Sequence, residues 1–281
     1  MSSQPLRPRA PTPRARPATT RPTALITGAS SGIGEALAHR FARAGFDLVL
    51  VARSADKLQA LAAALKAAHG IQAWVSPTDL AQPGAAAGLA AAMKRARRTI
   101  DVLVNNAGVL QHGPFIGMAP ADHQRLVDLN ISGLTAMLAQ FVPAMVARGQ
   151  GQVLNVASIA AFQPVPSLAT YAATKAYVLS LTESLSEELQ GSGVSITALC
   201  PGITATHMLA AASQASPVLA QLPAALVGSA EDVADEGFQA CMAGDVIRVP
   251  GLLNRAGVVV GRAAPKWLLR RLSGALVRRL K

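Results

Sequence analysis

Four polar side chains in the central part of the sequence could together move a proton to or from an oxygen atom. Tyr171 and Lys175 are spaced i and i+4, so on a helix both side chains would emerge on one face. Ser158 lies thirteen residues before Tyr171, and Asn130 precedes both. A carbonyl carbon that accepts a hydride builds negative charge on its oxygen, which then needs a proton donor and a positioned hydrogen-bond donor. The spacing therefore indicates Tyr171 as the acid of a carbonyl reduction.

This acid would have to be stronger than a free phenol. An ordinary tyrosine has a pKa of about 10, and bringing it near 7 requires about 4 kcal/mol of preference for the phenolate. We expect the Lys175 ammonium and the positive ring of an oxidised nicotinamide to supply that preference by proximity. The alternative is that Tyr171 and Lys175 form an ordinary pair on a helix surface and that Ser158 is only a cap.

A glycine-rich turn near the start of the sequence has the order of a dinucleotide-binding loop. The apolar run Ala24–Thr27 passes into Gly28-Ala-Ser-Ser-Gly32-Ile-Gly34, and a helical pattern follows. Gly28 would permit a sharp turn, Gly32 a close approach of backbone to a pyrophosphate, and Gly34 close packing of helix on sheet. The helix N-terminus would present backbone N–H groups to phosphate oxygens. A glycine-rich turn without a ligand is the alternative.

These motifs, in this order, resemble those of the short-chain dehydrogenase/reductase family in its single-domain branch. The segments TGASSGIG at 27–34 and NNAG at 105–108 and the Tyr171/Lys175 pair carry the likeness. The resemblance implies a seven-stranded doubly wound fold and a catalytic tetrad of Asn130, Ser158, Tyr171 and Lys175. In that tetrad Lys175 would also hydrogen-bond the nicotinamide ribose, Ser158 would hold the substrate oxygen, and Asn130 would help to seat a water that relays protons to Lys175.

The resemblance also implies NADP(H) as the cofactor. Arg53 follows Ala52 at the end of the second predicted strand, where NAD users of the family carry an Asp. The Arg53 guanidinium would bind the 2′-phosphate, and a solvated surface arginine is the alternative. Asp79 matches the position that contacts the adenine edge, and a helix N-cap is its alternative.

Further along the chain, the segment 201–206 resembles the loop that lines the nicotinamide in the family. Gly202 and Ile203 would contact the nicotinamide, and Thr206 would bind its carboxamide, while Thr204 replaces the usual Val. The predicted cofactor-binding residues are Gly28, Ser30, Ser31, Gly32, Ile33, Gly34, Arg53, Asp79, Leu80, Asn106, Ala107, Gly108, Tyr171, Lys175, Pro201, Gly202, Ile203 and Thr206.

The elements that must position these residues alternate along the chain. From Thr23 onward, short apolar runs alternate with longer segments of helical period, which predicts an α/β fold: a single doubly wound Rossmann domain with a parallel sheet buried on both faces. The predicted strands are Ala24–Thr27, Asp47–Ala52, Gln72–Ser76, Val102–Asn105, Gln152–Val156, Val194–Leu199 and Asp245–Val249. The predicted helices lie near 33–44, 54–68, 83–97, 122–148, 170–190 and 230–243.

Positive charge is concentrated at the two ends of the chain. The formal net charge is +11, yet residues 1–22 hold five arginines and residues 262–281 hold seven Lys or Arg, with no acid in either segment. The rest of the chain carries 14 bases against 15 acids and few aromatic residues, which does not favour specific nucleic-acid binding. We therefore expect a disordered Pro/Arg-rich arm at 1–22, a catalytic domain at 23–260 and a basic amphipathic helix at 261–281.

Cysteine usage and hydropathy bear on the compartment. The two cysteines form no CxxC pair and no His cluster has metal-ligand spacing, so neither a disulfide framework nor a metal site is predicted. No run with the character of a signal peptide or a transmembrane helix stands out, and we expect a cytoplasmic protein.

Two segments bear on substrate and partners. His207–Gly228, the expected substrate lid, contains no Lys, Arg, Asp or Glu, which predicts a small apolar carbonyl or alcohol as substrate, unless these residues simply pack on the core. In 265–281, leucines recur near helical spacing among basic residues. This helix would pack on the body or on a partner subunit, or it would rest peripherally on an anionic membrane surface.

Two alternative functions stay open on this fold. One is a non-catalytic NADPH-binding sensor or scaffold, for which the complete tetrad is not required. The other is a lipid-type ketoreductase at a membrane surface. The family resemblance further implies a homodimer or homotetramer built through the helices near 122–148 and 170–190.

Overall fold

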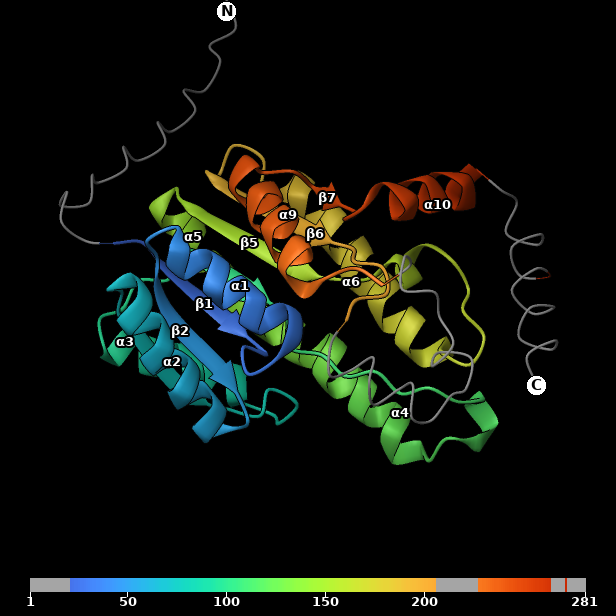
Figure 1. Cartoon of the computed structure of the whole chain (residues 1–281), viewed down its shortest axis with the longest axis horizontal. Helices are drawn as coiled ribbons and strands as arrows, with labels where there is room; N and C mark the ends of the chain where they lie inside the picture. Colours follow the sequence, from blue (N-terminus) through green and yellow to red (C-terminus); the bar gives the residue numbers. More distant parts are fainter. Residues whose placement is uncertain (1–20, 206–226, 264–270, 272–281) are drawn as a thin grey trace, which may run out of the picture.

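The computed structural model describes residues 21–205, 227–263 and 271. These residues build one parallel sheet with the strand order β3-β2-β1-β4-β5-β6-β7, so the predicted seven-stranded doubly wound fold is confirmed (Figure 1). The order reverses between β1 and β4, and in such sheets ligands bind beyond the carboxyl ends of the strands at that point. The strands are β1 (Thr23–Thr27), β2 (Asp47–Ala52), β3 (Ala73–Pro77), β4 (Val102–Asn105), β5 (Gly151–Val156), β6 (Val194–Leu199) and β7 (Ile247–Arg248).

Helices cover both faces of the sheet because the strands carry apolar side chains on both faces. Ile26 and Leu50 pack in one core with α1 (Gly32–Arg43), α2 (Ala55–His69) and α9 (Ala230–Ala243). The neighbouring residues Leu25 and Val51 point to the opposite face. There they pack in a second core with α3 (Ala85–Arg95), α5 (Leu134–Arg148) and α6 (Ala169–Glu188). All five residues of β1 are buried, as expected for a central strand.

The prediction of one continuous helix near 122–148 is wrong in detail. The structure has α4 (Pro120–Val127), a π-helical turn η2 (Asp128–Gly133) and then α5. In η2 the backbone of Gly133 approaches the loop after β3 so closely that a Cβ there would lie 2.6 Å from the carbonyl oxygen of Leu80. A wider π turn shifts the helical register, and such turns are frequent at functional sites. Asn130 lies within this turn and is buried.

The C-terminal part also differs from the predicted pattern. The last strand shortens from the predicted Asp245–Val249 to Ile247–Arg248, because the backbone N–H of Asp245 bonds to Ala240 and so belongs to the end of α9. An unpredicted helix, α10 (Leu252–Ala263), follows β7 and crosses the predicted domain boundary at 260. Short 3₁₀ turns η1 (Phe115–Gly117) and η3 (Ile159–Phe162) complete the described elements.

One described helical stretch is long and apolar enough to span a membrane. It is Pro120–Arg148, and 44% of its most apolar window is buried inside the molecule. The buried side chains of Met137, Leu138 and Phe141 pack against the sheet in the core that α3 and α6 share. This stretch therefore has the packing of a core helix.

Candidate active site

The glycine loop leaves β1 in a conformation that explains its glycines. Gly28 and Gly32 have φ values of 65° and 59°, in the left-handed region that favours glycine. Gly34 has no space for a side chain, because a Cβ would lie 2.2 Å from the carbonyl oxygen of Gly28 and 2.4 Å from Nδ2 of Asn106. The first turn of α1 thus packs directly on the loop and on the end of β4, as the spacing predicts.

Asn106 and Thr27 lock this loop to the sheet. Asn106 Nδ2 donates to the carbonyl oxygens of Thr27 at 3.0 Å and Gly28 at 3.2 Å. The Thr27 hydroxyl accepts the backbone N–H groups of Asn106 and Ala107 and donates to the carbonyl oxygen of Val104. All partners are backbone groups or neutral side chains of neighbouring strands. The resulting cluster holds the predicted Asn106-Ala107-Gly108 segment against the glycine loop.

The start of α1 offers donors that suit a phosphate. Ser31 is the N-cap residue with an extended backbone, and its side chain makes no capping hydrogen bond within the described chain. Ser30 is half-buried, and Gly32 and Ile33 begin the helix, whose first N–H groups have no partner inside the helix. Oriented N–H groups, a free hydroxyl and the positive end of a helix fit a pyrophosphate.

Arg53 and the Asp79-Leu80 pair lie at the ends of the strands beside this loop. The backbone N–H of Ala29 bonds to Val51, which brings the end of β2 to the loop, and Arg53 follows as an exposed residue. Asp79 accepts the backbone N–H of Ala81 at 3.1 Å, so it closes a turn and is not the N-cap of α3, which is Gly84. Leu80, the next residue, is buried.

The tetrad residues come together although they lie on three separate elements. Ser158 follows β5, Tyr171 and Lys175 lie on the first turns of α6, and Asn130 lies in η2. Ser158 and Tyr171 share a side-chain hydrogen bond, and the Lys175 Nζ lies 5.8 Å from the centre of the Tyr171 ring. Asn130 and Lys175 meet at Gly108, since a Cβ on that glycine would lie 3.2 Å from Asn130 Oδ1 and 3.6 Å from Lys175 Nζ.

Burial dominates the electrostatics of the Tyr171/Lys175 pair. Burial raises the pKa of Tyr171, and the hydrogen bond with Ser158 lowers it by less. Burial lowers the pKa of Lys175 from 10.5 to about 8, while Lys175 Nζ donates to the carbonyl oxygen of Val156 at 2.8 Å. The residues of the chain alone therefore raise the pKa of Tyr171. The predicted lowering toward 7 does not arise from Lys175 by itself and requires an added positive charge, which an oxidised nicotinamide would bring.

Asn130, which was predicted to help seat a water, uses its side chain mainly for hydrogen bonds within the protein. Its Oδ1 accepts the backbone N–H of Val109 at 2.9 Å, and its Nδ2 donates to the Val109 carbonyl at 3.0 Å and to the Thr174 hydroxyl at 3.1 Å. Both amide protons are used, so a water could be held only by a second lone pair of Oδ1 or by backbone groups. Asn130 thus ties the loop after β4 to the turn of α6 that carries Lys175.

The loop after β6 completes the described site. The Pro201 carbonyl accepts the N–H of Ile159, which links this loop to the turn of Ser158. Thr204, which stands where the family usually has Val, is buried and donates to the Gly202 carbonyl at 3.1 Å. Gly202 packs under Asn254 of α10, whose side-chain atoms would lie 2.5 Å from a Cβ. Thr206 and all but residues 227 and 228 of the predicted lid lie outside the described residues.

Several residues of the site were missed in the sequence. Thr27 and Thr174 contribute through the hydrogen bonds described above, which no sequence motif marks. Asn254 belongs to the unpredicted helix α10. His123 of α4 bonds to the Thr170 hydroxyl at 2.8 Å and to the Phe115 carbonyl at 3.1 Å. It therefore joins the loop around η1 to the residue next to Tyr171. Only the spacing of leucine and valine in 252–260 could have signalled α10.

Comparison with known proteins gives concordant matches. The family model described as short chain dehydrogenase matches residues 22–217. The oxidoreductase UcpA of Escherichia coli is 39% identical over 193 residues, which are 67% of this chain and 72% of UcpA. A short-chain dehydrogenase from Sphingobium yanoikuyae, solved in complex with NADPH, is 36% identical with a TM-score of 0.77, over 85% of this chain and 92% of that one. A 7β-hydroxysteroid dehydrogenase is 25% identical with a TM-score of 0.81, and the match covers 90% of this chain and 96% of that one.

Proposed function

The chain belongs to the short chain dehydrogenase family, and we propose that it uses NADP(H) to interconvert a carbonyl and an alcohol on a small apolar molecule. Membership makes it an oxidoreductase with a nicotinamide cofactor. The main support for the proposal is that Ser158, Tyr171 and Lys175 lie close together beyond the strand ends, beside the glycine loop. We propose the same catalytic domain as the sequence predicted, roughly 23–260.

The proposed chemistry assigns Tyr171 as general acid in reduction. A bound NADPH would supply the hydride to the carbonyl carbon. The Tyr171 hydroxyl gives its proton to the carbonyl oxygen, so that an alcohol forms and a phenolate is left. The Ser158 Oγ accepts the N–H of Ala160 at 3.1 Å, and its hydroxyl proton, which faces Tyr171 in this structure, would turn to the substrate oxygen when a substrate binds. In the oxidation direction, the same groups take the opposite proton roles.

Lys175 is suited to return a proton to Tyr171. Its pKa of about 8 lies close enough to neutrality for both protonation states to be accessible. The Val156 carbonyl fixes the position of Nζ, and the Asn130–Thr174 contact holds the helix turn around it. Lys175 therefore acts on the reaction through the charge and protonation of Tyr171, in addition to its proposed bond to the nicotinamide ribose.

NADP(H) is proposed over NAD(H) because of Arg53. Its guanidinium is exposed at the end of β2, beside the glycine loop, and could pair with a 2′-phosphate in two parallel hydrogen bonds. The relative from Sphingobium yanoikuyae is an NADPH complex. We expect Arg53→Ala to raise the KM for NADPH about tenfold or more and to leave the KM for NADH nearly unchanged. Equal effects on both cofactors, measured in steady-state assays, would contradict the assignment.

The substrate is proposed to be apolar. Phe115 and Ile116 are 62% and 97% exposed, and His123 fixes their loop to Thr170, next to Tyr171. The predicted lid adds no charged residue. The 7β-hydroxysteroid dehydrogenase, a structural neighbour, is named for a hydroxysteroid. The expected homodimer or homotetramer and the expected cytoplasmic location stay predictions.

The decisive experiment compares Tyr171→Phe with Tyr177→Phe in a screen that follows NADPH absorbance over matched charged and uncharged carbonyls. Tyr177 lies on the same helix, 36% exposed, with its hydroxyl 2.9 Å from the Thr135 hydroxyl. We expect Tyr171→Phe to lower kcat about 1000-fold while NADPH binding is kept, and Tyr177→Phe to have little effect. Normal turnover by Tyr171→Phe would refute the mechanism. NADPH binding without turnover of any carbonyl would instead favour the sensor or scaffold, and a clear preference for anionic carbonyls would refute the apolar substrate.

A further inference from the structure

Helix α10 exposes a continuous apolar face. Leu252, Leu253, Val259 and Val260 are 81%, 70%, 67% and 67% exposed. At 100° per residue they fall within one third of the helix circumference, and the small residue Ala256 lies between them, also exposed. The opposite side carries Asn254 and Val258, which are half-buried, and Gly261, which is buried. We refer to Leu252, Leu253, Val259 and Val260 as the α10 apolar face.

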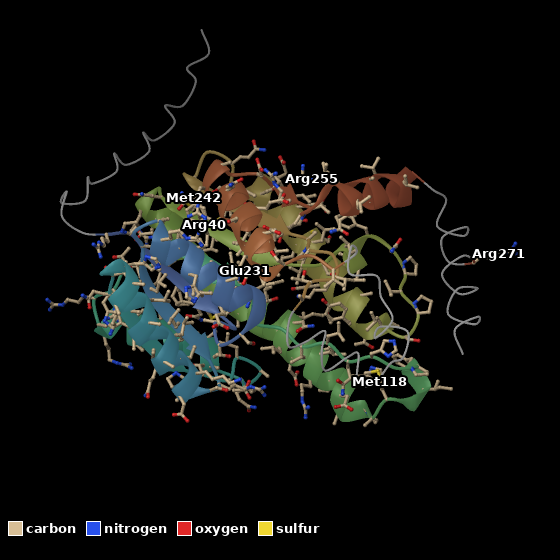
Figure 2. All side chains as sticks on the ribbon, viewed as in Figure 1. Arg40, Met118, Glu231, Met242, Arg255 and Arg271 are labelled. Atoms are coloured by element: carbon tan, nitrogen blue, oxygen red, sulfur yellow. The ribbon has the colours of Figure 1, made fainter. Side chains whose placement is uncertain are left out.

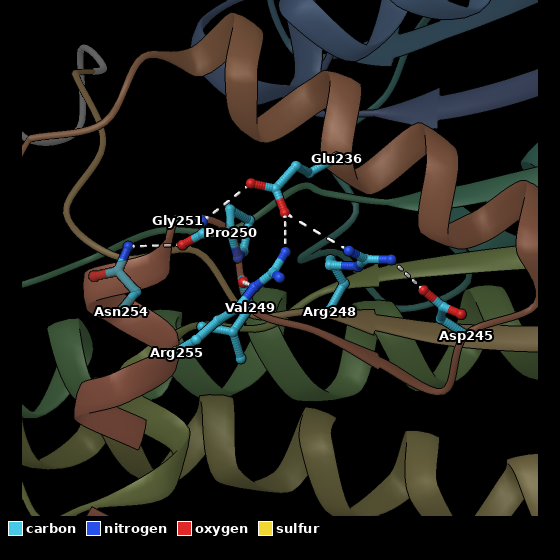
Figure 3. Close-up of polar contacts among 8 residues, drawn as sticks. All are labelled: Glu236, Asp245, Arg248, Val249, Pro250, Gly251, Asn254 and Arg255. Carbon is cyan, nitrogen blue, oxygen red and sulfur yellow. Dashed lines mark hydrogen bonds and ion pairs between the residues drawn. The ribbon is translucent and has the colours of Figure 1, made fainter. Parts of the chain in front are cut away.

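The orientation of this face is set by polar contacts on the other side of the helix. Glu236 of α9 accepts the backbone N–H of Gly251 at 3.0 Å and pairs with Arg255 at 2.6 Å (Figure 3). Arg255 also donates to the Val249 carbonyl at 2.8 Å, and Asn254 donates to the Pro250 carbonyl at 2.8 Å. These contacts hold α10 beyond β7, where it projects from the body of the molecule (Figure 1).

Charge identifies the surface that fits this face. The 30 residues from Leu252 to Lys281 carry eight Lys or Arg and no Asp or Glu, whereas residues 23–251 carry 13 bases and 15 acids. An exposed aliphatic stripe followed by acid-free basic sequence matches segments that lie in the interface of a bilayer with anionic headgroups. Pairing of this face with a second copy would bring two such positive segments together, which like-charge repulsion opposes.

We propose that the α10 apolar face, together with the basic residues that flank and follow it, docks the protein on the surface of an anionic lipid bilayer. The side chains Leu252, Leu253, Val259 and Val260 enter the boundary between headgroups and acyl chains, while Arg255 stays paired with Glu236. The proposal is independent of the proposed reaction. Because Asn254 lies against Gly202, docking would bring the nicotinamide loop close to the bilayer.

The test is co-sedimentation of the full chain with vesicles of phosphatidylcholine alone or of equal parts phosphatidylcholine and phosphatidylglycerol. We expect binding to the mixed vesicles, weaker binding at high salt, and little binding to phosphatidylcholine alone. The double variant Leu253→Asp/Val259→Asp should lower the affinity for mixed vesicles about tenfold or more. Ile116→Asp is the matched control, because Ile116 is an exposed aliphatic residue of η1 and should leave vesicle binding unchanged. Met118, which follows η1, and Arg255 of α10 lie at opposite sides of the molecule (Figure 2).

A second measurement reports directly on the α10 apolar face. It does not require that the double variant Leu253→Asp/Val259→Asp folds. Both native cysteines are buried, and burial raises the pKa of Cys241 to about 12, so a thiol-reactive dye would label an introduced cysteine selectively. A polarity-sensitive dye on Val259→Cys should shift to the blue with mixed vesicles, whereas the same dye on Ile116→Cys should not. NADPH binding by each variant verifies its fold.

Three results would overturn the proposal. One is full recovery of the wild-type chain in the supernatant with mixed vesicles at low salt. Another is unchanged vesicle binding by Leu253→Asp/Val259→Asp, together with no shift of the dye on Val259→Cys, which would assign binding to the basic residues alone. The third is a result that shows pairing of two copies through this face. In that case the dye on Val259→Cys would already be blue-shifted without vesicles, and adding Leu253→Asp would reverse the shift. The double variant Leu253→Asp/Val259→Asp would also have a smaller sedimentation coefficient than the wild type.

Discussion

The glycine loop and helix α10 both flank the proposed cofactor site, but they are held by different kinds of interaction. The loop is fixed by partly buried, neutral hydrogen bonds between the side chains of Asn106 and Thr27 and backbone groups. Helix α10 is held largely by half-exposed charges, with Glu236 between Arg248 and Arg255. Neutral hydrogen bonds that are partly shielded from water are insensitive to salt and costly to leave unmade, whereas exposed ion pairs contribute little and are screened. The cofactor side should therefore be the more robust of the two.

The largest expected effect comes from forcing the glycine loop apart with Gly34→Ala. The new Cβ would lie 2.2 Å from the Gly28 carbonyl and 2.4 Å from Asn106 Nδ2, so the loop and its clamp must separate. We expect a loss of about 3 kcal/mol or more in the free energy of unfolding and a loss of NADPH affinity of about 100-fold. Denaturant unfolding and NADPH fluorescence titration would measure both.

The matched control for that substitution is Gly88→Ala. Gly88 lies in helix α3, and a Cβ added there would have nothing within 4 Å, so alanine should be neutral or stabilise the helix by up to about 1 kcal/mol. If Gly34→Ala bound NADPH with wild-type affinity, the close contact between α1 and the loop would have no role in the cofactor site, and the contrast with α10 would fail.

A buried charge on the cofactor side should produce the next largest effect, visible in the pH dependence of stability. The pKa of Lys175 falls from 10.5 to about 8 on folding. Below pH 8 the folded protein carries the buried ammonium at a cost, and between about 8 and 10.5 the folded state releases the proton while the unfolded chain keeps it. This group therefore makes the free energy of unfolding rise with pH across that window, by up to about 3 kcal/mol.

Comparison of variants isolates that contribution from other titrating groups. Lys175→Met should remove the rise between pH 8 and 10.5, and Lys66→Met, which removes an exposed lysine of α2, should retain it. Denaturant unfolding at several pH values gives the two slopes. Identical slopes for Lys175→Met and the wild type would mean that the ammonium is solvated in the folded protein.

The same contrast explains which features could be predicted from the sequence. The glycine loop and the Tyr171/Lys175 pair depend on residues close in sequence, so their spacing predicts a sharp turn and a shared helix face. The burial of β1 and β2 on both faces likewise follows from short, nearly continuous apolar runs. These features are set by local geometry, which a sequence pattern records directly.

The missed features depend on contacts between distant elements. The π turn at 128–133 follows from contact of Gly133 with Leu80 and from the bonds of Asn130 to Val109 and Thr174, none of which a helical period records. Helix α10 was missed because its apolar residues face outward and its ion pairs reach back to α9. Burial raises the pKa of Tyr171 in the protein alone, and the spacing of Tyr171 and Lys175 does not record that burial.

The substitution Glu236→Gln, which weakens the attachment of α10, should have the smallest effect on the free energy of unfolding. Glutamine keeps an oxygen that can accept the N–H of Gly251, while the charge that faces Arg255 at 2.6 Å and Arg248 at 3.9 Å is lost. Because these side chains are 29% to 43% exposed, we expect a loss of about 1 kcal/mol or less at low salt, and almost none at high salt. Glu188→Gln, which neutralises an exposed carboxylate at the end of α6, controls for the change in net charge. Thermal unfolding at the two salt concentrations measures the difference, and a larger loss that persists at high salt would show that α10 is anchored as firmly as the glycine loop.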